Sequence, residues 1–347
     1  MMKEILALEY RNDALHMIDQ RKLPPVYEIF IATTYREVDF AIQNMVVRGA
    51  PAIGAAAAYG AALAAREFAG EERGAFLKKM DKSLDLLNQS RPTAVNLMWA
   101  VNRMRTLIVE NQMLPVPELA ARILREAHAV VEEDKAINLA MGNHGNSLIP
   151  EKATILTHCN TGALAAVGIG TALGAVRQAF YAGKDIFVYA DETRPRLQGG
   201  RLTAWELVQE GIPAKLIADN VAATLIRDGK IDLIMVGADR IATNGDTANK
   251  IGTFMLSVLA KTYQVPFYIV APTTTIDFNI VSGTEIIIEE RSSDEVTHIE
   301  GLRIAPEGIG VYNPAFDVTP HGNITGIVTE KGILRAPFKE SIMKLVE

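Results

Sequence analysis

The chain has 347 residues, of which 49% are hydrophobic and 22% are charged, and at roughly 150 residues per domain this length predicts about two domains. Lys and Arg together number 35 against 41 Asp and Glu, a formal net charge of −6 that argues against a general nucleic-acid binder. The single cysteine, Cys159, excludes an internal disulfide, a zinc ribbon and a CxxC redox motif, so we expect a reducing, cytoplasmic setting.

The first part of the chain combines a short strand element with helices. Strand-like runs at Ile5–Tyr10 and Ala14–Gln20, separated by turn residues, predict a hairpin. Apolar residues at three- and four-residue spacing then predict helices at Glu37–Asn44, Pro51–Phe68, Arg73–Asn88, Val95–Gln112 and Pro115–Glu133. We assign these elements to an N-terminal domain of residues 1–147.

No segment has the pattern of a signal peptide or a membrane span. The N-terminal sequence turns polar after a short apolar run. The longest stretch of low polarity, Ala50–Ala65, is alanine-rich and shorter than the roughly 20 residues that span a bilayer. We interpret it as a closely packed core helix and expect no membrane partner.

After Pro150 short apolar strands alternate with helices. The expected strands are Ala153–Cys159, Asp185–Ala190, Ala214–Ala218, Ile231–Val236, Val265–Val270 and Gly326–Thr329. The expected helices are Gly162–Ala182, Leu202–Glu210, Val221–Asp228 and Asn249–Tyr263. This alternation is typical of a mostly parallel sheet covered on both faces. We therefore predict a doubly wound α/β domain over residues 148–347.

The glycines after the first strand do not indicate a dinucleotide site. Gly168, Gly170 and Gly174 lack the spacing of the dinucleotide-binding fingerprint. We interpret them as positions where a helix packs tightly on the sheet, and we expect no nicotinamide cofactor.

Ligands of open α/β sheets bind beyond the carboxyl ends of the strands, where this sequence places Cys159 and Asp239. Cys159 is either a buried structural thiol or a thiolate favoured by a helix that begins a few residues later. Its neighbour His158 is interpreted as structural or as a support for the site. Asp239 follows an almost wholly apolar run, where desolvation would keep a general acid protonated. An ion pair with Arg240 and a loop cap are the alternatives for Asp239.

Three predicted helix starts carry a cation, and helix N-termini and cations both favour anions. They are Arg48-Gly49-Ala50-Pro51, Arg91-Pro92-Thr93 and Asn249-Lys250. For the first, the alternative is a packing turn in which Gly49 only permits the conformation. Together the three indicate a phosphorylated small molecule as the ligand.

Four runs of the sequence closely resemble the methylthioribose-1-phosphate isomerase family, in the same order and over nearly the whole chain. They are Arg48–Gly54, Thr157–Gly162, Glu192–Pro195 with Gln198-Gly199, and Gly237–Arg240 through Asn249–Thr253. That family shares its fold with ribose-1,5-bisphosphate isomerase and with non-enzymatic regulatory subunits of the exchange factor for eukaryotic translation initiation.

The resemblance implies a Rossmann-like C-terminal domain, a homodimer, and no metal or organic cofactor. Cys159 and Asp239 match the family's catalytic pair. The positions that match its substrate contacts are Arg48, Gly49, Ala50, Arg91, Gln198, Asn249 and Lys250. Arg194 and Asp246 also fall inside the shared runs.

The implied reaction converts 5-methylthio-α-D-ribose 1-phosphate to 5-methylthio-D-ribulose 1-phosphate in methionine salvage. Phosphate on the anomeric carbon locks the ring, so an acid must protonate the ring oxygen, a role that suits Asp239. Cys159 could then move hydrogen from C2 to C1 through an enediol. Alternatively, the hydrogen moves as hydride and a base removes only the O2 proton.

Arg48, Arg91 and Lys250 are expected to hold the phosphate, and Gln198 a ring hydroxyl. One alternative activity is that of a ribose-1,5-bisphosphate isomerase, which would need a further cationic site at C5. The other is a regulatory subunit that binds a phosphorylated ligand without turnover, for which the pair of Cys159 and Asp239 would have no purpose.

Overall fold

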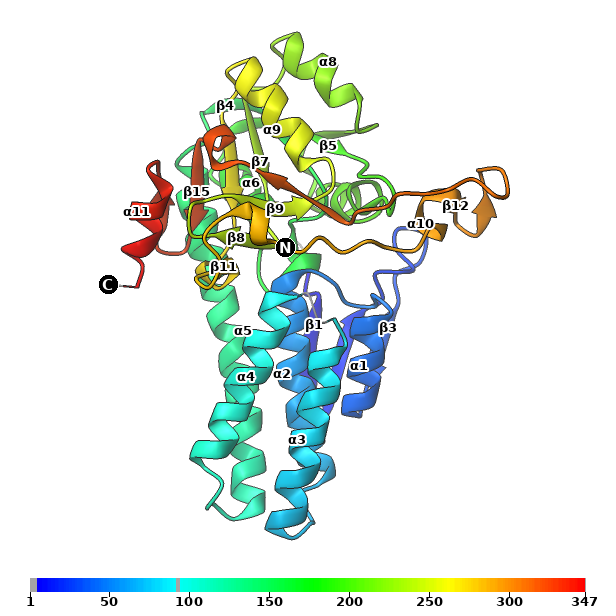
Figure 1. Ribbon diagram of the computed structural model, residues 1–347, viewed down its shortest axis with the longest axis vertical. Helices are drawn as coiled ribbons and strands as arrows, with labels where there is room; N and C mark the ends of the chain where they lie inside the picture. Colours follow the sequence, from blue (N-terminus) through cyan, green and yellow to red (C-terminus); the bar gives the residue numbers. More distant parts are fainter. Residues whose placement is uncertain (1–4, 92–93, 347) are drawn as a thin grey trace. The chain divides into compact units, whose positions relative to one another are not determined.

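The computed structural model describes residues 5–91 and 94–346 (Figure 1). Its contacts divide the chain into two compact units. The first comprises Met1–Leu139 with Gly162–Gly170, and the second comprises Ala140–Thr161 with Thr171–Glu347. The predicted domain boundary at residue 147 stays a prediction. Within the described ranges, no helix is both long and apolar enough to cross a membrane.

The first unit begins with a three-stranded antiparallel sheet of β1 (Leu8–Arg11), β2 (Ala14–Ile18) and β3 (Ile29–Ala32). Arg11 pairs with Ala14, which leaves a two-residue turn at Asn12-Asp13. Both turn residues have positive φ angles, 50° and 58°, as tight hairpins require. The predicted hairpin is confirmed. The third strand was not predicted, because four residues are too few to show alternation.

Five helices follow: α1 (Tyr35–Gln43), α2 (Ala50–Glu67), α3 (Arg73–Gln89), α4 (Val95–Glu110) and α5 (Val116–Asn146). The first four agree with the predicted ranges to within a few residues. The prediction for the fifth was too short, because polar residues and glycines after Glu133 obscure the helical pattern.

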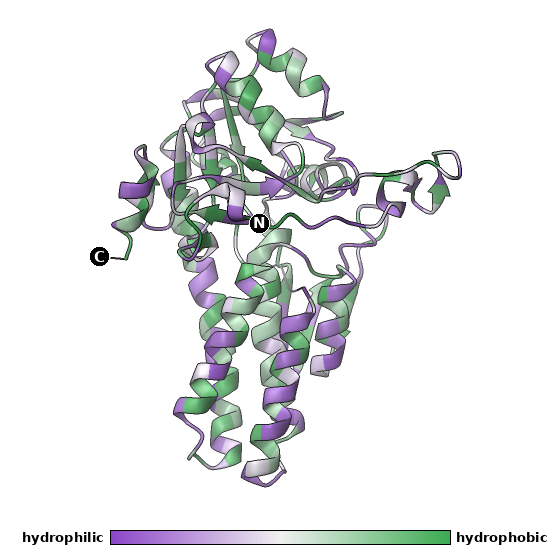
Figure 2. Cartoon of the chain, viewed as in Figure 1, coloured by the Kyte–Doolittle hydropathy of each residue, from purple (hydrophilic) through white to green (hydrophobic). Residues whose placement is uncertain are grey.

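Helix α2 forms the core of the first unit. Every residue from Ala52 to Ala65 is buried. Figure 2 shows α2 in pale green, whereas α3 carries hydrophilic residues in purple. Small side chains let its neighbours approach closely, since a Cβ added at Gly54 would lie 2.9 Å from the carbonyl oxygen of Asn96 in α4. The predicted core helix is confirmed.

The second unit is built on a seven-stranded sheet in the order β16-β15-β10-β7-β4-β5-β6. Its strands are β4 (Lys152–Thr157), β5 (Asp185–Asp191), β6 (Ala214–Ile217), β7 (Leu233–Val236), β10 (Phe267–Val270), β15 (Gly326–Thr329) and β16 (Gly332–Leu334). All neighbours are parallel except β15 and β16. Helices between the strands are α6 (Ala172–Tyr181), α7 (Ala204–Glu210), α8 (Val221–Arg227) and α9 (Thr253–Thr262). The predicted doubly wound α/β fold is confirmed.

The strand order reverses between β4 and β7. From β4 the chain adds β5 and β6 on one side, and then returns to place β7, β10 and β15 on the other side. Such a reversal opens a crevice beyond the carboxyl ends of the two strands, where α/β proteins bind ligands.

A smaller sheet, in the order β11-β8-β9-β14, follows the end of β7. Its strands are β8 (Arg240–Ala242), β9 (Thr247–Lys250), β11 (Ile276–Asp277) and β14 (Phe316–Thr319). Further short elements are α10 (Asp294–Thr297), β12 (His298–Ile299), β13 (Leu302–Arg303) and α11 (Phe338–Met343). None of these elements was predicted. Strands of two to four partly polar residues and helices of four or six residues are too short to show a periodic pattern.

The predicted helix Gly162–Ala182 was wrong in its first half, since α6 begins only at Ala172. Before it lies a short 3₁₀ turn, Ala163–Ala165, followed by irregular chain. The interpretation of Gly168 as a contact between a helix and the sheet was also wrong. A Cβ added at Gly168 would lie 3.2 Å from the Cα of Lys135 in α5, so this glycine lets an irregular segment approach a helix.

Two hydrogen bonds hold this segment in the first unit. Gln20 Nε2 donates to the carbonyl oxygen of Leu164 (2.7 Å), and the N–H of Val167 donates to the Asp134 carboxylate (2.9 Å). Burial raises the pKa of the Asp134 carboxyl to about 6, although the hydrogen bond from Val167 opposes that rise. The segment therefore depends on a carboxylate that is costly to ionise.

We predict that Asp134→Asn increases the free energy of unfolding at pH 7. The folded chain keeps the Asp134 proton up to about pH 6, whereas the unfolded chain loses it near pH 4, so this group lowers stability as the pH rises through that window. The amide oxygen can still accept the Val167 bond without the cost of burying a charge. Urea denaturation should show a gain of roughly 1–2 kcal/mol at pH 7 that vanishes near pH 4. A variant less stable than the parent at pH 7 would contradict this.

Candidate active site

Cys159 lies just beyond β4, which ends at Thr157, and its φ angle of 63° is in the left-handed region. Its N–H donates to Thr193 Oγ1 (2.9 Å), and its carbonyl oxygen accepts from Thr203 Oγ1 (2.7 Å). This conformation costs a residue with a side chain on the order of 1–2 kcal/mol, and the two bonds from the chain after β5 hold it. Only 9% of the residue is exposed, so Cys159 is a fixed, nearly buried thiol.

No α-helix begins a few residues after Cys159, where the sequence predicted one. Only the 3₁₀ turn Ala163–Ala165 follows closely, and α6 begins at Ala172. The N–H of Leu173 in its first turn donates to the carbonyl oxygen of Thr161. The argument that a helix N-terminus favours the thiolate therefore loses its premise.

His158 is fully surrounded by protein, and both ring nitrogens are hydrogen bonded. Nδ1 lies 2.9 Å from the Asp191 carboxylate, and Nε2 lies 2.9 Å from the carbonyl oxygen of Ile251. Burial opposes a charged ring, but the hydrogen bond and the charge of Asp191 outweigh it and raise the pKa of His158. The interpretation of His158 as a structural or supporting residue is consistent with these contacts.

The chain after β5 forms a π-helical turn, Gly199–Thr203, a rare element that is frequent at functional sites. Gly199 must lack a side chain, because an added Cβ would lie 1.7 Å from the carbonyl oxygen of Asp191. Gln198 immediately precedes the turn and is only 7% exposed. Its Oε1 is buried without a hydrogen-bond partner among the described residues, so Gln198 has an acceptor to offer a ligand.

Asp239 follows β7 and is half-buried. The chain between them passes close to the end of β4, since a Cβ added at Gly237 would lie 3.1 Å from Thr161 Cγ2. The N–H of Asp239 donates to the carbonyl oxygen of Ala248 (2.9 Å). Ala248 is the residue before Asn249, so this bond places the backbone of Asp239 next to β9.

Asn249 and Lys250 end the strand β9, so the prediction that they open a helix was wrong. Both are buried. Asn249 Nδ2 donates to Thr253 Oγ1 (3.0 Å), whereas Lys250 Nζ donates to the carbonyl oxygen of Ala315 (2.9 Å). The ammonium also lies 4.2 Å from the centre of the Phe316 ring. Alternating small, polar and charged residues concealed this strand in the sequence.

The start of α9 is occupied by a carboxylate of the protein. Asp317 on β14 accepts hydrogen bonds from the N–H groups of Gly252 (2.7 Å) and Phe254 (3.0 Å). This helix start therefore does not provide the anion seat that was predicted for Asn249-Lys250. The lysine side chain itself is the cation at this place.

The second unit thus brings together the ends of β4, β5, β7 and β9. Cys159 is hydrogen bonded to the chain after β5, the loop before Asp239 passes Thr161, and the N–H of Asp239 is bonded to Ala248 in β9. Cys159, Gln198 and Asp239 follow neighbouring strands of the seven-stranded sheet, whereas Asn249 and Lys250 end a strand of the smaller sheet.

The predicted residues of the first unit lie at the start of α2. Gly49 is its N-cap, with a φ angle of 94°, and Pro51 is in its first turn. Gly49 is also pressed against Ala165, because an added Cβ would lie 2.3 Å from the Ala165 carbonyl oxygen. Arg48 and Ala50 flank Gly49 and are half-buried. The predicted helix start is present. Gly49 also makes the packing contact that was the alternative to an anion site.

Arg91 follows Ser90, the C-cap of α3, and precedes α4, which begins at Val95. It is half-buried. The rest of the predicted motif, Pro92-Thr93, lies outside the described residues.

The other residues of the shared motifs take part in bonds within the protein. Arg240 lies 3.7 Å from the Asp277 carboxylate, and the Arg194 guanidinium donates to the carbonyl oxygen of Val296 (2.9 Å). Asp246 accepts hydrogen bonds from Asn244, Gly283 and His321. Although burial opposes ionisation, these bonds lower the pKa of Asp246, which is typical of a structural carboxylate.

One group of described residues has the composition of a metal site. Single ligand atoms of His158, Asp191 and Asp219 lie within 4.8 Å of one another. Asp219 accepts the N–H groups of Thr193 (2.6 Å) and Arg194 (2.7 Å), and His158 is bonded as described above. We interpret the group as a hydrogen-bonded network that orders the strand ends.

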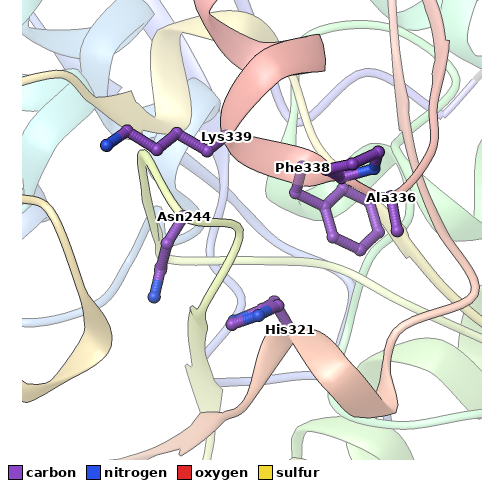
Figure 3. A pocket seen from close by; sticks show the side chains of 6 residues that line it. Asn244, His321, Ala336, Phe338 and Lys339 are labelled. Atoms are coloured by element: carbon purple, nitrogen blue, oxygen red, sulfur yellow. The ribbon is translucent and has the colours of Figure 1, made fainter.

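A separate open pocket of about 450 Å³ lies in the second unit (Figure 3). It is lined by Asn244, His321, Ala336, Pro337, Phe338 and Lys339. None of the predicted site residues lines it.

The model of the initiation factor 2 subunit family matches residues 46–336. A methylthioribose-1-phosphate isomerase of Thermoanaerobacter sp. (strain X514) is 68% identical over 344 residues, which cover 99% of this chain and 100% of that protein. One of Natranaerobius thermophilus is 55% identical over 349 residues and covers 100% of both chains.

Solved structures show the same relationship. The 5-methylthioribose 1-phosphate isomerase of Pyrococcus horikoshii OT3 has a TM-score of 0.94 and 48% identity, and the match covers 99% of this chain and 96% of that chain. The delta subunit of translation initiation factor eIF-2B from A. fulgidus has a TM-score of 0.88 and 40% identity, with 99% of both chains covered.

We predict that Gly49→Ala destabilises the protein by at least about 2 kcal/mol, since it combines a left-handed backbone with a steric clash. Gly183→Ala is the matched control. Gly183 has a φ angle of 87° but nothing within 4 Å of an added Cβ, so only the backbone term of about 1 kcal/mol applies. Urea denaturation measures both variants. Equal losses would show that the Ala165 contact does not constrain Gly49.

Proposed function

The chain belongs to the initiation factor 2 subunit family, in its methylthioribose-1-phosphate isomerase branch, and we propose that it converts 5-methylthio-α-D-ribose 1-phosphate to 5-methylthio-D-ribulose 1-phosphate in methionine salvage. This activity makes it an aldose–ketose isomerase, which is an intramolecular oxidoreductase. We further propose that it acts in the cytoplasm, in keeping with its single cysteine, and that it is a homodimer, as the family resemblance implies.

The proposal that Cys159 and Asp239 are the catalytic pair rests on their positions after two neighbouring strands. Cys159 and Asp239 follow β4 and β7, which are neighbouring parallel strands at the reversal of the sheet. Leu156 pairs with Ile234, three residues before Cys159 and five residues before Asp239. A thiol and a carboxyl group at these two ends suit a substrate that needs both an acid and a base.

In the proposed mechanism Asp239 is the general acid. The anomeric phosphate prevents spontaneous ring opening, so the ring oxygen must receive a proton while the phosphate stays attached. The strand before Asp239 is buried along its length and Asp239 itself is half-buried; we propose that its carboxyl group donates this proton. Asn249 follows Ala248, which accepts the Asp239 N–H, and we propose that it orients the carboxyl group or a sugar hydroxyl.

Cys159 serves the hydrogen transfer from C2 to C1. In one route the thiolate removes the proton from C2 and returns it to C1 through an enediol. In the other, hydrogen moves as hydride between the two carbons and the thiolate removes only the O2 proton. The low exposure of Cys159 supports either route, because a dry site suppresses loss of phosphate.

Turnover in deuterated water distinguishes these routes. Solvent deuterium at C1 of the ketose indicates the enediol, whereas its absence favours hydride migration, provided that the base is not shielded from solvent.

The phosphate and the hydroxyl groups need fixed partners during ring opening, since expulsion of phosphate is the competing reaction. We propose that Lys250, Arg48 and Arg91 hold the phosphate together with the backbone at Gly49 and Ala50. Gln198, whose Oε1 is buried without a partner among the described residues, is proposed to accept a hydrogen bond from a ring hydroxyl.

We predict that Cys159→Ala and Asp239→Asn each lower kcat by at least about 10³-fold, because each removes a group that acts on the transferred protons. Steady-state assays with the methylthio sugar phosphate measure the loss, and circular dichroism checks that the fold is retained.

Ribose 1,5-bisphosphate in the same assay tests the alternative isomerase. Turnover near that of the parent in either variant would remove that residue from the mechanism, and no turnover by the parent would favour a regulatory subunit.

A further inference from the structure

We infer that His158 is a positioning residue for the phosphate, because it ties the turn that carries Lys250 to the strand end that carries Cys159. The inference rests on the proposed phosphate role of Lys250. It assigns to His158 no contact with the substrate and no proton transfer.

The imidazole supports the turn after β9 in two ways. Its Nε2 lies 2.9 Å from the carbonyl oxygen of Ile251, the residue after Lys250. Its ring also touches the next residue, Gly252, where an added Cβ would lie 3.0 Å from the ring Cε1. Gly252 has a φ angle of 103°, so its missing side chain serves both the turn and the contact with the ring.

The hydrogen-bond partners define the protonation of the ring. A carbonyl oxygen only accepts, so Nε2 must carry a hydrogen and donate to Ile251. A second proton is shared between Nδ1 and the Asp191 carboxylate, 2.9 Å away. A nitrogen that must stay protonated to hold a carbonyl group is unsuited to act as a general base. Positioning is the role that this arrangement leaves to His158.

Other hydrogen bonds of the turn lead to a different part of the unit. Lys250 Nζ and the Ile251 N–H both donate to the carbonyl oxygen of Ala315, and the Gly252 N–H donates to Asp317. These bonds fasten the turn to β14 and its preceding residue. The His158 bond instead fastens it to β4, so its loss should leave the small sheet intact while Lys250 shifts relative to Cys159.

Two substitutions of His158 separate its two bonds. Asparagine places its amide nitrogen near the position of Nδ1, so His158→Asn keeps the Asp191 bond and loses the Ile251 bond. Glutamine reaches the position of Nε2, so His158→Gln keeps the Ile251 bond. We expect KM for 5-methylthioribose 1-phosphate to rise about tenfold in H158N, as for one lost charge-assisted bond. The rise should exceed any fall in kcat, and H158Q should restore KM to within about threefold of the parent.

His144→Gln is the matched control. His144 Nδ1 also lies 2.9 Å from a carbonyl oxygen, that of Thr329 on β15, which is separated from β4 by two strands. Loss of this bond can lower Tm but should leave KM unchanged. A merely structural role of His158 predicts the same result for H158N, namely a lower Tm or active fraction at constant KM.

Lys250→Ala distinguishes failure of this inference from failure of the proposed function. If K250A raises KM and H158N does not, the inference is overturned and the phosphate site stands. If K250A leaves both KM and kcat unchanged, the phosphate role of Lys250 fails and the inference fails with it. Equal KM values in H158N and H158Q would also overturn it. Should H158N not fold, Gly252→Ala disturbs the same contact from the other side, and an unchanged KM in G252A would then contradict the inference.

Discussion

The parallel pairing of β4 with β7 is the constraint on which the rest of the proposed site depends. Both strands are buried and apolar at their ends, so their register is fixed by packing on both faces of the sheet. The residues that follow them have to emerge at the same edge. The strand order reverses here, as it does at the ligand crevices of other α/β proteins, and our proposal places the substrate between Cys159 and Asp239.

Buried polar groups keep these strand ends rigid. Thr193 and Thr203 hold the strained backbone of Cys159, whereas His158 and Asp191 connect β4 with β5 and with the turn after β9. One oxygen of this network, Asp191 Oδ1, is buried without a hydrogen-bond partner among the described residues. These side-chain hydrogen bonds, and not a helix N-terminus, hold the residues that follow β4 and β5 in place.

The sequence was sufficient to predict the parts of the fold that have strong periodicity. The hairpin, the first four helices and the buried parallel strands agree with the structure, and polar residues after the strands correctly marked the edge that carries Cys159 and Asp239. Periodicity was insufficient where strands are short and polar. Asn249 and Lys250 were assigned to a helix, although cross-strand pairing with Phe316 and Asp317 makes them the end of β9. That pairing joins residues far apart in the chain and leaves no local signal, as does the bond between His158 and Ile251.

The most direct test of the account uses the fact that Cys159 is the sole thiol of the chain. In the Asp239→Asn variant, which should bind 5-methylthioribose 1-phosphate without converting it, the rate of Cys159 alkylation by iodoacetamide is measured against sugar-phosphate concentration. The account predicts that alkylation slows in a saturable manner as the sugar phosphate fills the crevice. An alkylation rate that does not change, at concentrations that saturate turnover of the parent enzyme, would contradict the placement of Cys159 in the substrate site.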